Sequence, residues 1–194
     1  MKELMGTPDR SIPRDLLARS QCIVVIPGLK KGAFVFGGKY GRGFAACRHG
    51  ASWGAPAAVR IEGGSFGLQI GGSSTDVILL VMNRRGMDRL TADKFTLGGE
   101  AAAAAGPVGR HASANTDVTM RAEILSWSRS QGVFAGLSLE GATLRPDSGE
   151  NEKLYGKPLS NGDILVGRTA VPARARVFTS ALNRYVPAPT RSGR

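Results

Sequence analysis

Short apolar runs separated by glycine pairs and polar clusters organise most of this chain. The run "CIVVIP" (22–27) is dominated by β-branched residues, which predicts a buried strand that ends at its proline. Comparable runs predict further strands over 55–62, 65–72 and 76–82. Short strands divided by turn residues in this way are typical of a β-rich fold.

Two longer stretches predict β-hairpins. In "GAFVFGGKYGRGFAACRHG", two apolar segments flank a glycine-rich turn over residues 37–43. Further along, apolar and polar positions alternate over 120–126, and the alternation resumes beyond Gly132. The second pattern indicates one long hairpin.

Helical spacing is limited to short segments. The stretches "IPRDLLAR", "NRRGMDRLTAD" and "SGENEKLYG" each predict one or two helical turns. Ser160 and Asp163 have the spacing of a capping box ahead of "ILVG". Pro172 can open a last helix, in which apolar residues from Val177 to Tyr185 recur at helical intervals and predict a face that docks on the domain.

The segment "AAAAAGPVGR" (101–110) carries conflicting local signals. Alanine is the best helix former, and proline the worst, so the segment predicts a short apolar helix or a buried turn that ends at Gly106 and Pro107. No composition break or fixed-period repeat divides the chain here, which argues against a linker between two domains.

Composition narrows the fold class. A chain of 194 residues with 42% hydrophobic residues is long enough for one domain with a sizeable core. Its 27 glycines indicate many turns and bulges. We therefore expect a single α+β domain: a strongly bent, mostly antiparallel β-sheet, or a closed barrel, with short peripheral helices.

The formal net charge of +11 leaves nucleic acid, anionic lipid and acidic protein filaments open as partners. Cations gather in or just before the first predicted hairpin, where four aromatic residues lie between positions 34 and 44. Cations beside aromatic side chains suit an anionic membrane surface, although a solvated polar face with the aromatics in the core is the alternative. The five candidate lipid-binding residues are Lys30, Lys31, Lys39, Arg42 and Arg48.

Motifs for catalysis are incomplete. "GGSFG" fits GxSxG with Ser65 as nucleophile, but a strand-like segment follows it where a hydrolase has a helix, and neither His49 nor His111 has a recognisable acid–base setting. A Walker loop fails at Ala33 and Tyr40. No zinc ligand set, RNP-like motif or helix-turn-helix spacing occurs, so we expect no catalytic residue, metal or cofactor, and no nucleic-acid partner.

The two cysteines bear on the redox setting. Cys22 and Cys47 lie in apolar surroundings without CxxC spacing, which favours small buried residues over metal ligands or a disulfide. No apolar run approaches the about 20 residues that cross a bilayer, and "MKELMGTPDR" contains no signal-peptide core. We expect a soluble chain, whose compartment would be extracytoplasmic if an export signal once preceded it.

Several stretches together resemble the SYLF domain family, a lipid-binding domain also known as the yeast-type actin-binding domain. They are "IPRDLLARSQCIVVIP", "GAFVFGGKYGRG", "WGAPAAV", "GGSFGLQIGGSSTDVILLVM", "FTLGGEAAAAAGPVGR", "EILSWSRSQGVFAGLSLEGA" and "LYGKPLSNGDIL". The resemblance runs in order from about residue 12 to 167. It implies an N-terminal extension (1–11), a domain that includes the last helix (12–186) and a basic tail (187–194).

The resemblance implies a non-enzymatic lipid-binding module. Eukaryotic relatives are known for phosphoinositide recognition and actin association, and an amphipathic N-terminal helix contributes to their membrane contact. Bacterial members, which this chain resembles, are generally described as lipid-binding and are often exported or membrane-associated. Here only "MKELMGT" precedes the matching region, so lipid binding would rest on the domain body. An actin-type protein-interaction module is the alternative, and a serine hydrolase ranks third.

The resemblance also places residues 101–110 inside the domain. We expect Gly106 and Pro107 to turn Arg110 outward or toward a carboxylate such as Asp76 or Glu140. A pairing that fixes the loop is favoured over contact with a lipid headgroup.

Overall fold

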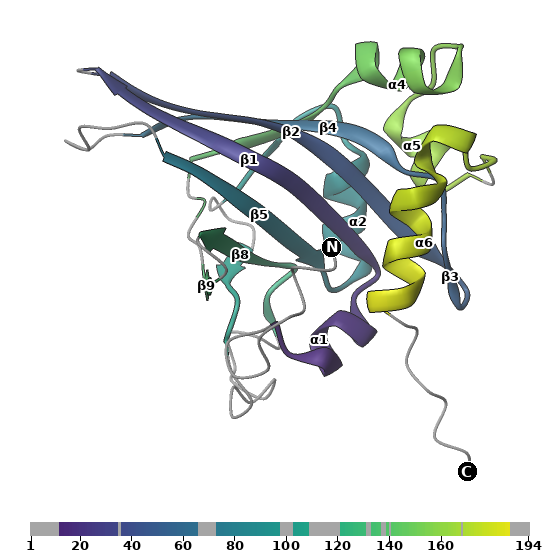
Figure 1. The fold of residues 1–194 in the computed structure, drawn as a ribbon, viewed down its shortest axis with the longest axis horizontal. Helices are drawn as coiled ribbons and strands as arrows, with labels where there is room; N and C mark the ends of the chain where they lie inside the picture. The colour runs from purple at the N-terminus through teal and green to yellow at the C-terminus, as the bar shows by residue number, and fades with distance from the viewer. Residues whose placement is uncertain are drawn as a thin grey trace.

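A long antiparallel hairpin of β1 (Cys22–Phe34) and β2 (Phe36–His49) forms the centre of the fold (Figure 1). The computed structural model describes residues 12–34, 36–65, 73–97, 103–108, 121–130, 133–136, 139, 141–167 and 169–186. The strand expected from "CIVVIP" is confirmed, but its expected end at Pro27 is wrong. A bulge between Ile26 and Leu29 takes Pro27 out of the hydrogen-bonded ladder, so β1 continues.

The turn of this hairpin lies closer to the N-terminus than residues 37–43, which the sequence pattern predicted. Phe34 pairs with Phe36, and the glycine-rich segment is part of β2. A Cβ on Gly43 would overlap the backbone at Val25, and one on Gly41 would lie 2.7 Å from the side chain of Ile26. The glycines therefore permit close packing of β2 on β1 instead of forming a turn.

The sheet runs in the order β6-β10-β4-β2-β1-β5-β8-β7 and is strongly curled. The expected α+β class with a bent, mostly antiparallel sheet is confirmed, and among the described strands only β7 pairs in parallel, with β8. Beyond Ser65, the strand expected over 65–72 lies outside the described residues. The remaining strands are β3 (Ser52–Trp53), β4 (Ala57–Ser65), β5 (Ser73–Val81), β6 (Phe95–Thr96), β7 (Ala103–Ala105), β8 (Ile124–Ser130), β9 (Val133–Gly136) and β10 (Thr143–Pro146).

Short helices form where the sequence predicted them. They are α1 (Arg14–Arg19), α2 (Arg84–Thr91), α4 (Ser148–Tyr155), α5 (Asn161–Leu165) and α6 (Arg176–Tyr185), the last preceded by a 3-10 turn (Ala173–Ala175). The predicted capping box is confirmed: the backbone N–H of Asp163 donates to Ser160 Oγ at 3.0 Å, and the N–H of Ser160 donates to Asp163 Oδ2 at 3.3 Å. The second predicted hairpin is present as β8 and β9, but its first strand begins at Ile124 and not near residue 120.

The alanine segment is a strand where a helix or turn was expected. Ala103–Ala105 pair in parallel with β8, because hydrogen bonding to a neighbouring strand outweighs the helical preference of alanine. Gly106 then packs directly on the ring of Trp127, where a Cβ would overlap the indole. Trp127 Nε1 donates to the carbonyl of Pro107 at 3.0 Å, which fixes this end of the segment. Arg110 lies outside the described residues.

The two faces of the sheet are covered differently. Apolar side chains on one face, here called the inner face, form a continuous core that α2 and α5 close through Leu90 and Ile164. On the opposite, outer face a second apolar cluster lies under α1 and α6, which contribute Leu16 and Leu182. These two helices cover one end of the outer face and leave the other end open to solvent (Figure 1).

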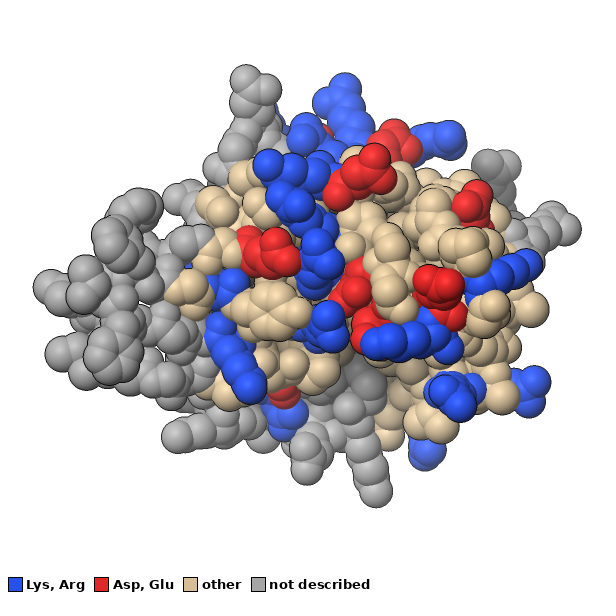
Figure 2. Space-filling view, turned by 90° about the horizontal axis from the view of Figure 1, so that it is seen from above, with Lys and Arg blue, Asp and Glu red and all other residues tan. Residues whose placement is uncertain are grey.

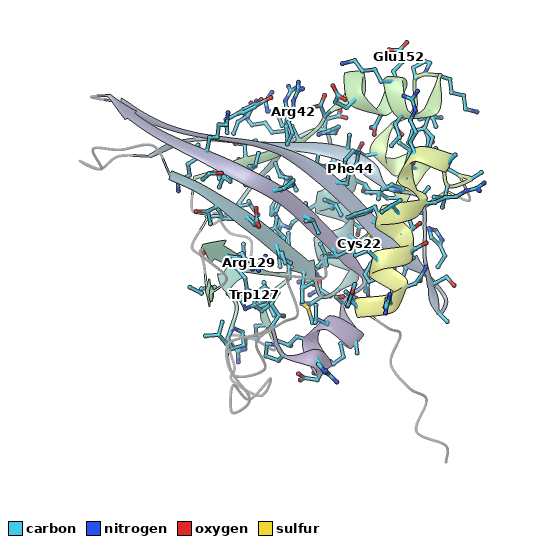
Figure 3. All side chains as sticks on the ribbon, in the orientation of Figure 1. Cys22, Arg42, Phe44, Trp127, Arg129 and Glu152 are labelled. Atoms are coloured by element: carbon cyan, nitrogen blue, oxygen red, sulfur yellow. A yellow bond between two sulfur atoms is a disulfide. The ribbon has the colours of Figure 1, made fainter. Side chains whose placement is uncertain are left out.

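A disulfide joins Cys22 and Cys47, so the expectation of two unlinked cysteines is wrong, whereas their expected burial is confirmed. The two residues are 25 positions apart in sequence but lie directly opposite each other in β1 and β2, with Cα atoms 4.0 Å apart. Side chains are especially close at such cross-strand positions. The bond therefore closes the central hairpin inside the core (Figure 3).

We expect loss of this disulfide to lower the free energy of unfolding by about 3 kcal/mol, because it restricts the unfolded chain over a loop of moderate length. Urea unfolding of the oxidised protein and of the Cys22→Ala/Cys47→Ala double variant measures the difference. Thiol titration of the unreduced, unfolded protein serves as a control and should find none. Two free thiols, or equal unfolding energies, would contradict the assignment.

Candidate functional site

The open part of the outer face carries alternating aromatic and basic side chains along β2. Tyr40, Arg42 and Phe44 are exposed, while Gly41 and Gly43 between them are buried on the inner face. This follows from the two-residue period of a strand. The glycines thus leave the inner side of β2 without side chains, and the chemistry of this segment lies outside.

Three arginines form a row across this face. Arg42 of β2 lies opposite Arg60 of β4, which lies opposite Arg145 of β10. Like charges at directly opposed positions repel, so such a row needs compensation. Strand register alone places Arg60 and Arg145 in this row, so the sequence pattern did not predict either residue.

Carboxylates lie between these arginines. Glu62 pairs with Arg60 at 2.7 Å and with Arg145 at 3.9 Å, whereas Asp147 and Glu150 pair with Arg42 at 3.1 and 3.5 Å. Seen from above, the molecule shows a band of Lys and Arg side chains interrupted by Asp and Glu (Figure 2). The outer face is therefore a mixed surface with excess positive charge.

Neighbouring groups also shift the pKa values of Arg42 and Glu150 on this face. Asp147 raises the pKa of Arg42 most, followed by a hydrogen bond with Tyr40. The pKa of Glu150 is lowered chiefly by Lys153, which donates to it at 2.8 Å, and less by Arg42. Arg42 and Glu150 therefore stay charged at neutral pH.

The predicted lysines lie toward the far end of the hairpin. Lys30 is exposed and opposite Tyr40, so it shares the outer face with Arg42. Lys31 and Lys39 form the next cross-strand pair, and alternation places Lys39 on the other side of the sheet from Tyr40. For Lys31 the structure describes only the backbone. The hairpin thus brings four of the five candidates together, distributed over two faces.

Arg48, the fifth candidate, lies at the opposite end of β2 in an internal network. Its guanidinium donates to the carbonyls of Ser20, Leu17 and Val186 at 3.0 to 3.2 Å. It also stacks on the ring of Trp53, 4.3 Å from the centroid, and burial lowers its pKa. Arg48 therefore joins the carboxyl-terminal ends of α1 and α6, and its predicted lipid contact stays a prediction.

An apolar patch borders the arginine row where α6 crosses the sheet. The rings of Phe44 and Phe178 lie 6.1 Å apart, and Figure 3 shows Phe44 beside α6. Val177, which helical spacing assigned to the docked face, is 81% exposed instead. Arg174 and Arg176 next to it are exposed as well.

Buried amides hold α4, and with it Glu150, against the sheet. Asn151 Oδ1 accepts the backbone N–H of Ala58 at 2.7 Å, and its Nδ2 donates to Asn161 Oδ1 at 2.7 Å. Tyr155 at the end of α4 donates its hydroxyl to the carbonyl of Pro56 at 2.6 Å. The carboxylates facing Arg42 are thus fixed by the fold.

The residues of the hydrolase alternative do not meet. Ser65 lies opposite Gly37 at one end of β2, whereas His49 closes the other end and contacts the carbonyl of Leu165 at 3.1 Å. His49 lines a cavity of about 590 Å³, and His111 lies outside the described residues. Within the described part of the chain, no three His, Cys, Asp or Glu residues are placed to hold a metal ion, and no helix has the length and apolarity to span a membrane.

Comparison with known proteins points to one family. The family described as "Ysc84: Las17-binding protein actin regulator" matches residues 62–185. An SH3 domain-containing protein of Schizosaccharomyces pombe is 34% identical over 90% of this chain and 41% of its own length. The SH3 domain-containing YSC84-like protein 1 of Homo sapiens is 31% identical over 92% of this chain and 52% of its own length. Protein YSC84 of Saccharomyces cerevisiae is 32% identical over 86% of this chain and 36% of its own length. The chain thus spans about half or less of these curated relatives.

We expect Arg48→Ala to lower the free energy of unfolding by about 2 to 4 kcal/mol, because several partly buried carbonyls lose a charged donor. Arg42→Ala, which removes an exposed arginine of the same strand, should change it by less than about 1 kcal/mol. Urea unfolding followed by circular dichroism measures both. Equal effects of the two substitutions would contradict the structural role of Arg48.

Burial raises the pKa of Tyr155 to about 12. Because the unfolded phenol ionises near pH 10, unfolding releases a proton between about pH 10 and 12, and the contribution of Tyr155 to stability is lost as pH rises through this window. Ultraviolet titration of tyrosinate should show a transition near pH 12 that is absent in Tyr155→Phe. A titration curve above pH 10 that is unchanged in Tyr155→Phe would contradict the burial of this hydroxyl.

Proposed function

This chain belongs to the Ysc84, or SYLF, family, and we propose that it is a non-enzymatic module that binds anionic lipid or membrane surfaces reversibly. The outer face supports this proposal best, because exposed Tyr40 and Phe44 alternate there with Arg42, and Lys30 lies alongside. Aromatic side chains are suited to the interface between water and lipid, and cations to the headgroups. Lys31 and Lys39 extend the same hairpin.

The balance of charge on this face fits weak, reversible binding. A cation near an anionic leaflet contributes about 1 kcal/mol, so a few cations suffice for peripheral association. Glu62, Asp147 and Glu150 offset part of this attraction. In this proposal Arg48 supports the face by fixing α6, and its direct contact with lipid is the least supported of the five.

We propose further that the chain works in an oxidising compartment, as expected for an exported member of the family. The buried Cys22–Cys47 disulfide supports this, because cytosolic reductants keep most thiols reduced. The same observation favours lipid over actin as the partner, since actin filaments are cytosolic.

An actin-type interaction module is the second candidate. Its support comes from the family description, which names an actin regulator, and from the yeast relative named YSC84. The same basic face would then meet an acidic filament.

Cosedimentation with liposomes tests the lipid proposal. We expect binding to vesicles that contain phosphatidylglycerol, little binding to pure phosphatidylcholine, and a steady loss as salt rises, because the Debye length shrinks from about 10 Å at 0.1 M to about 3 Å at 1 M. Lys30→Glu and Arg42→Glu should each weaken binding severalfold. Arg84→Glu, an equal charge change on α2, should not.

Equal binding to neutral and anionic vesicles, or no binding, would remove the lipid proposal. A filament-pelleting assay run beside it ranks the two candidates. Sedimentation with filamentous actin in the absence of vesicle binding would replace the lipid with the actin assignment.

A further inference from the structure

We propose that the beginning of α6 is the apolar anchor of the membrane contact, with Val177 entering the interfacial layer of the bilayer next to two headgroup-binding arginines, Arg174 and Arg176. This inference rests on the proposed lipid binding and adds to it the element that inserts. The anchor lies outside the five residues considered above, all of which belong to the first hairpin.

Val177 stands out among the large hydrophobic side chains of the described residues for its exposure. At 81% it is the most exposed large hydrophobic residue of the described chain, ahead of Val166 at 58% and Tyr40 at 45%. A single exposed valine is ordinary on a protein surface. Here, however, it is followed by half-buried Phe178, whose ring centroid lies 6.1 Å from that of exposed Phe44, so apolar side chains extend from α6 onto β2.

The remainder of α6 is firmly held, which keeps Val177 outside. Leu182 and Val186 are buried in the outer cluster, and the carbonyl of Val186 accepts from Trp53 Nε1 at 2.9 Å and from Arg48 at 3.1 Å. Asn183 Oδ1 accepts the backbone N–H of Trp53 at 3.1 Å. The helix cannot roll to bury Val177 without breaking these bonds.

The charge around Val177 selects an anionic occupant. No Asp or Glu occurs after Asp163 in the whole sequence, whereas six arginines follow it. Arg174 and Arg176 also stand where α6 begins, and cations are unfavourable there because the helix dipole is positive at that end. Lipid phosphates would neutralise the charges of the two arginines and the positive end of the helix dipole. A symmetric contact with a second copy would instead bring like charges together.

Together these observations describe a small wedge: exposed Val177, with two exposed arginines just before it in the chain and the Phe178–Phe44 ring pair beside it. Membrane-bound proteins place apolar side chains at the acyl boundary and basic ones at the headgroups in this way. Because Arg42 and Phe44 lie next to this wedge on the same face, both elements can touch one surface at the same time.

A fluorophore that reports polarity, attached at Val177→Cys, tests the anchor in the full chain. The native cysteines are bridged, so the new thiol is the one available for labelling. With vesicles of equal parts phosphatidylcholine and phosphatidylglycerol, we expect a blue shift and quenching by brominated acyl chains. Val108→Cys, an exposed valine next to β7, is the matched control and should show neither.

Cosedimentation of the same labelled samples separates the two proposals. Binding to vesicles without a blue shift at position 177 would overturn the anchor and leave the lipid-binding proposal intact. No binding of the unlabelled wild-type protein would overturn both. A blue shift on filamentous actin but not on vesicles would assign the patch to a protein partner and overturn the commitment to lipid.

A second variant guards against an effect of the label. Val177→Asp adds a charge to a solvated position, so its unfolding midpoint should stay close to that of the wild type. Its affinity for the same vesicles should fall at least about tenfold, equivalent to about 1.4 kcal/mol. Unchanged affinity with unchanged stability would refute the anchor.

Discussion

The close approach of β2 to β1 at Gly41 and Gly43 is the constraint on which the rest of the structure depends. No larger residue fits at either position, since a Cβ would meet the backbone or side chains of β1. With the inner side of this segment bare, the sheet can curl tightly over the core. The two-residue period then requires Tyr40, Arg42 and Phe44 to face solvent. The glycines that close packing requires and the exposed side chains of the candidate binding surface therefore lie on opposite faces of β2.

The exposed surface that results also brings like charges close together. Strand register sets Arg60 and Arg145 beside Arg42, and only partial compensation comes from Glu62 and the carboxylates near α4. Such a face attracts anions yet retains internal partners that compete for its guanidinium groups. Binding is then reversible and sensitive to salt, as expected of a peripheral contact.

Local sequence signals correctly predicted those elements whose structure depends on residues close together in the chain. The capping box at Ser160 and the strand that begins with β-branched residues after Cys22 are examples. The errors arose where partners are distant in sequence: Cys22 meets Cys47 across the hairpin, and the alanine strand exists because β8 lies beside it. The arginine row depends on three strands, and no pattern within one strand reveals it. Helical periodicity likewise identified α6 but not which of its edge residues, such as Val177, stays in water.

The central claim is that this outer face, rather than the charge of the whole molecule, meets the membrane. Paramagnetic relaxation from spin-labelled headgroups in phosphatidylglycerol vesicles tests it most directly, residue by residue. The account predicts broadening of the amide resonances of residues 40–44 and 174–178, and none over α2, which covers the inner face. Uniform broadening, or broadening confined to α2, would contradict it.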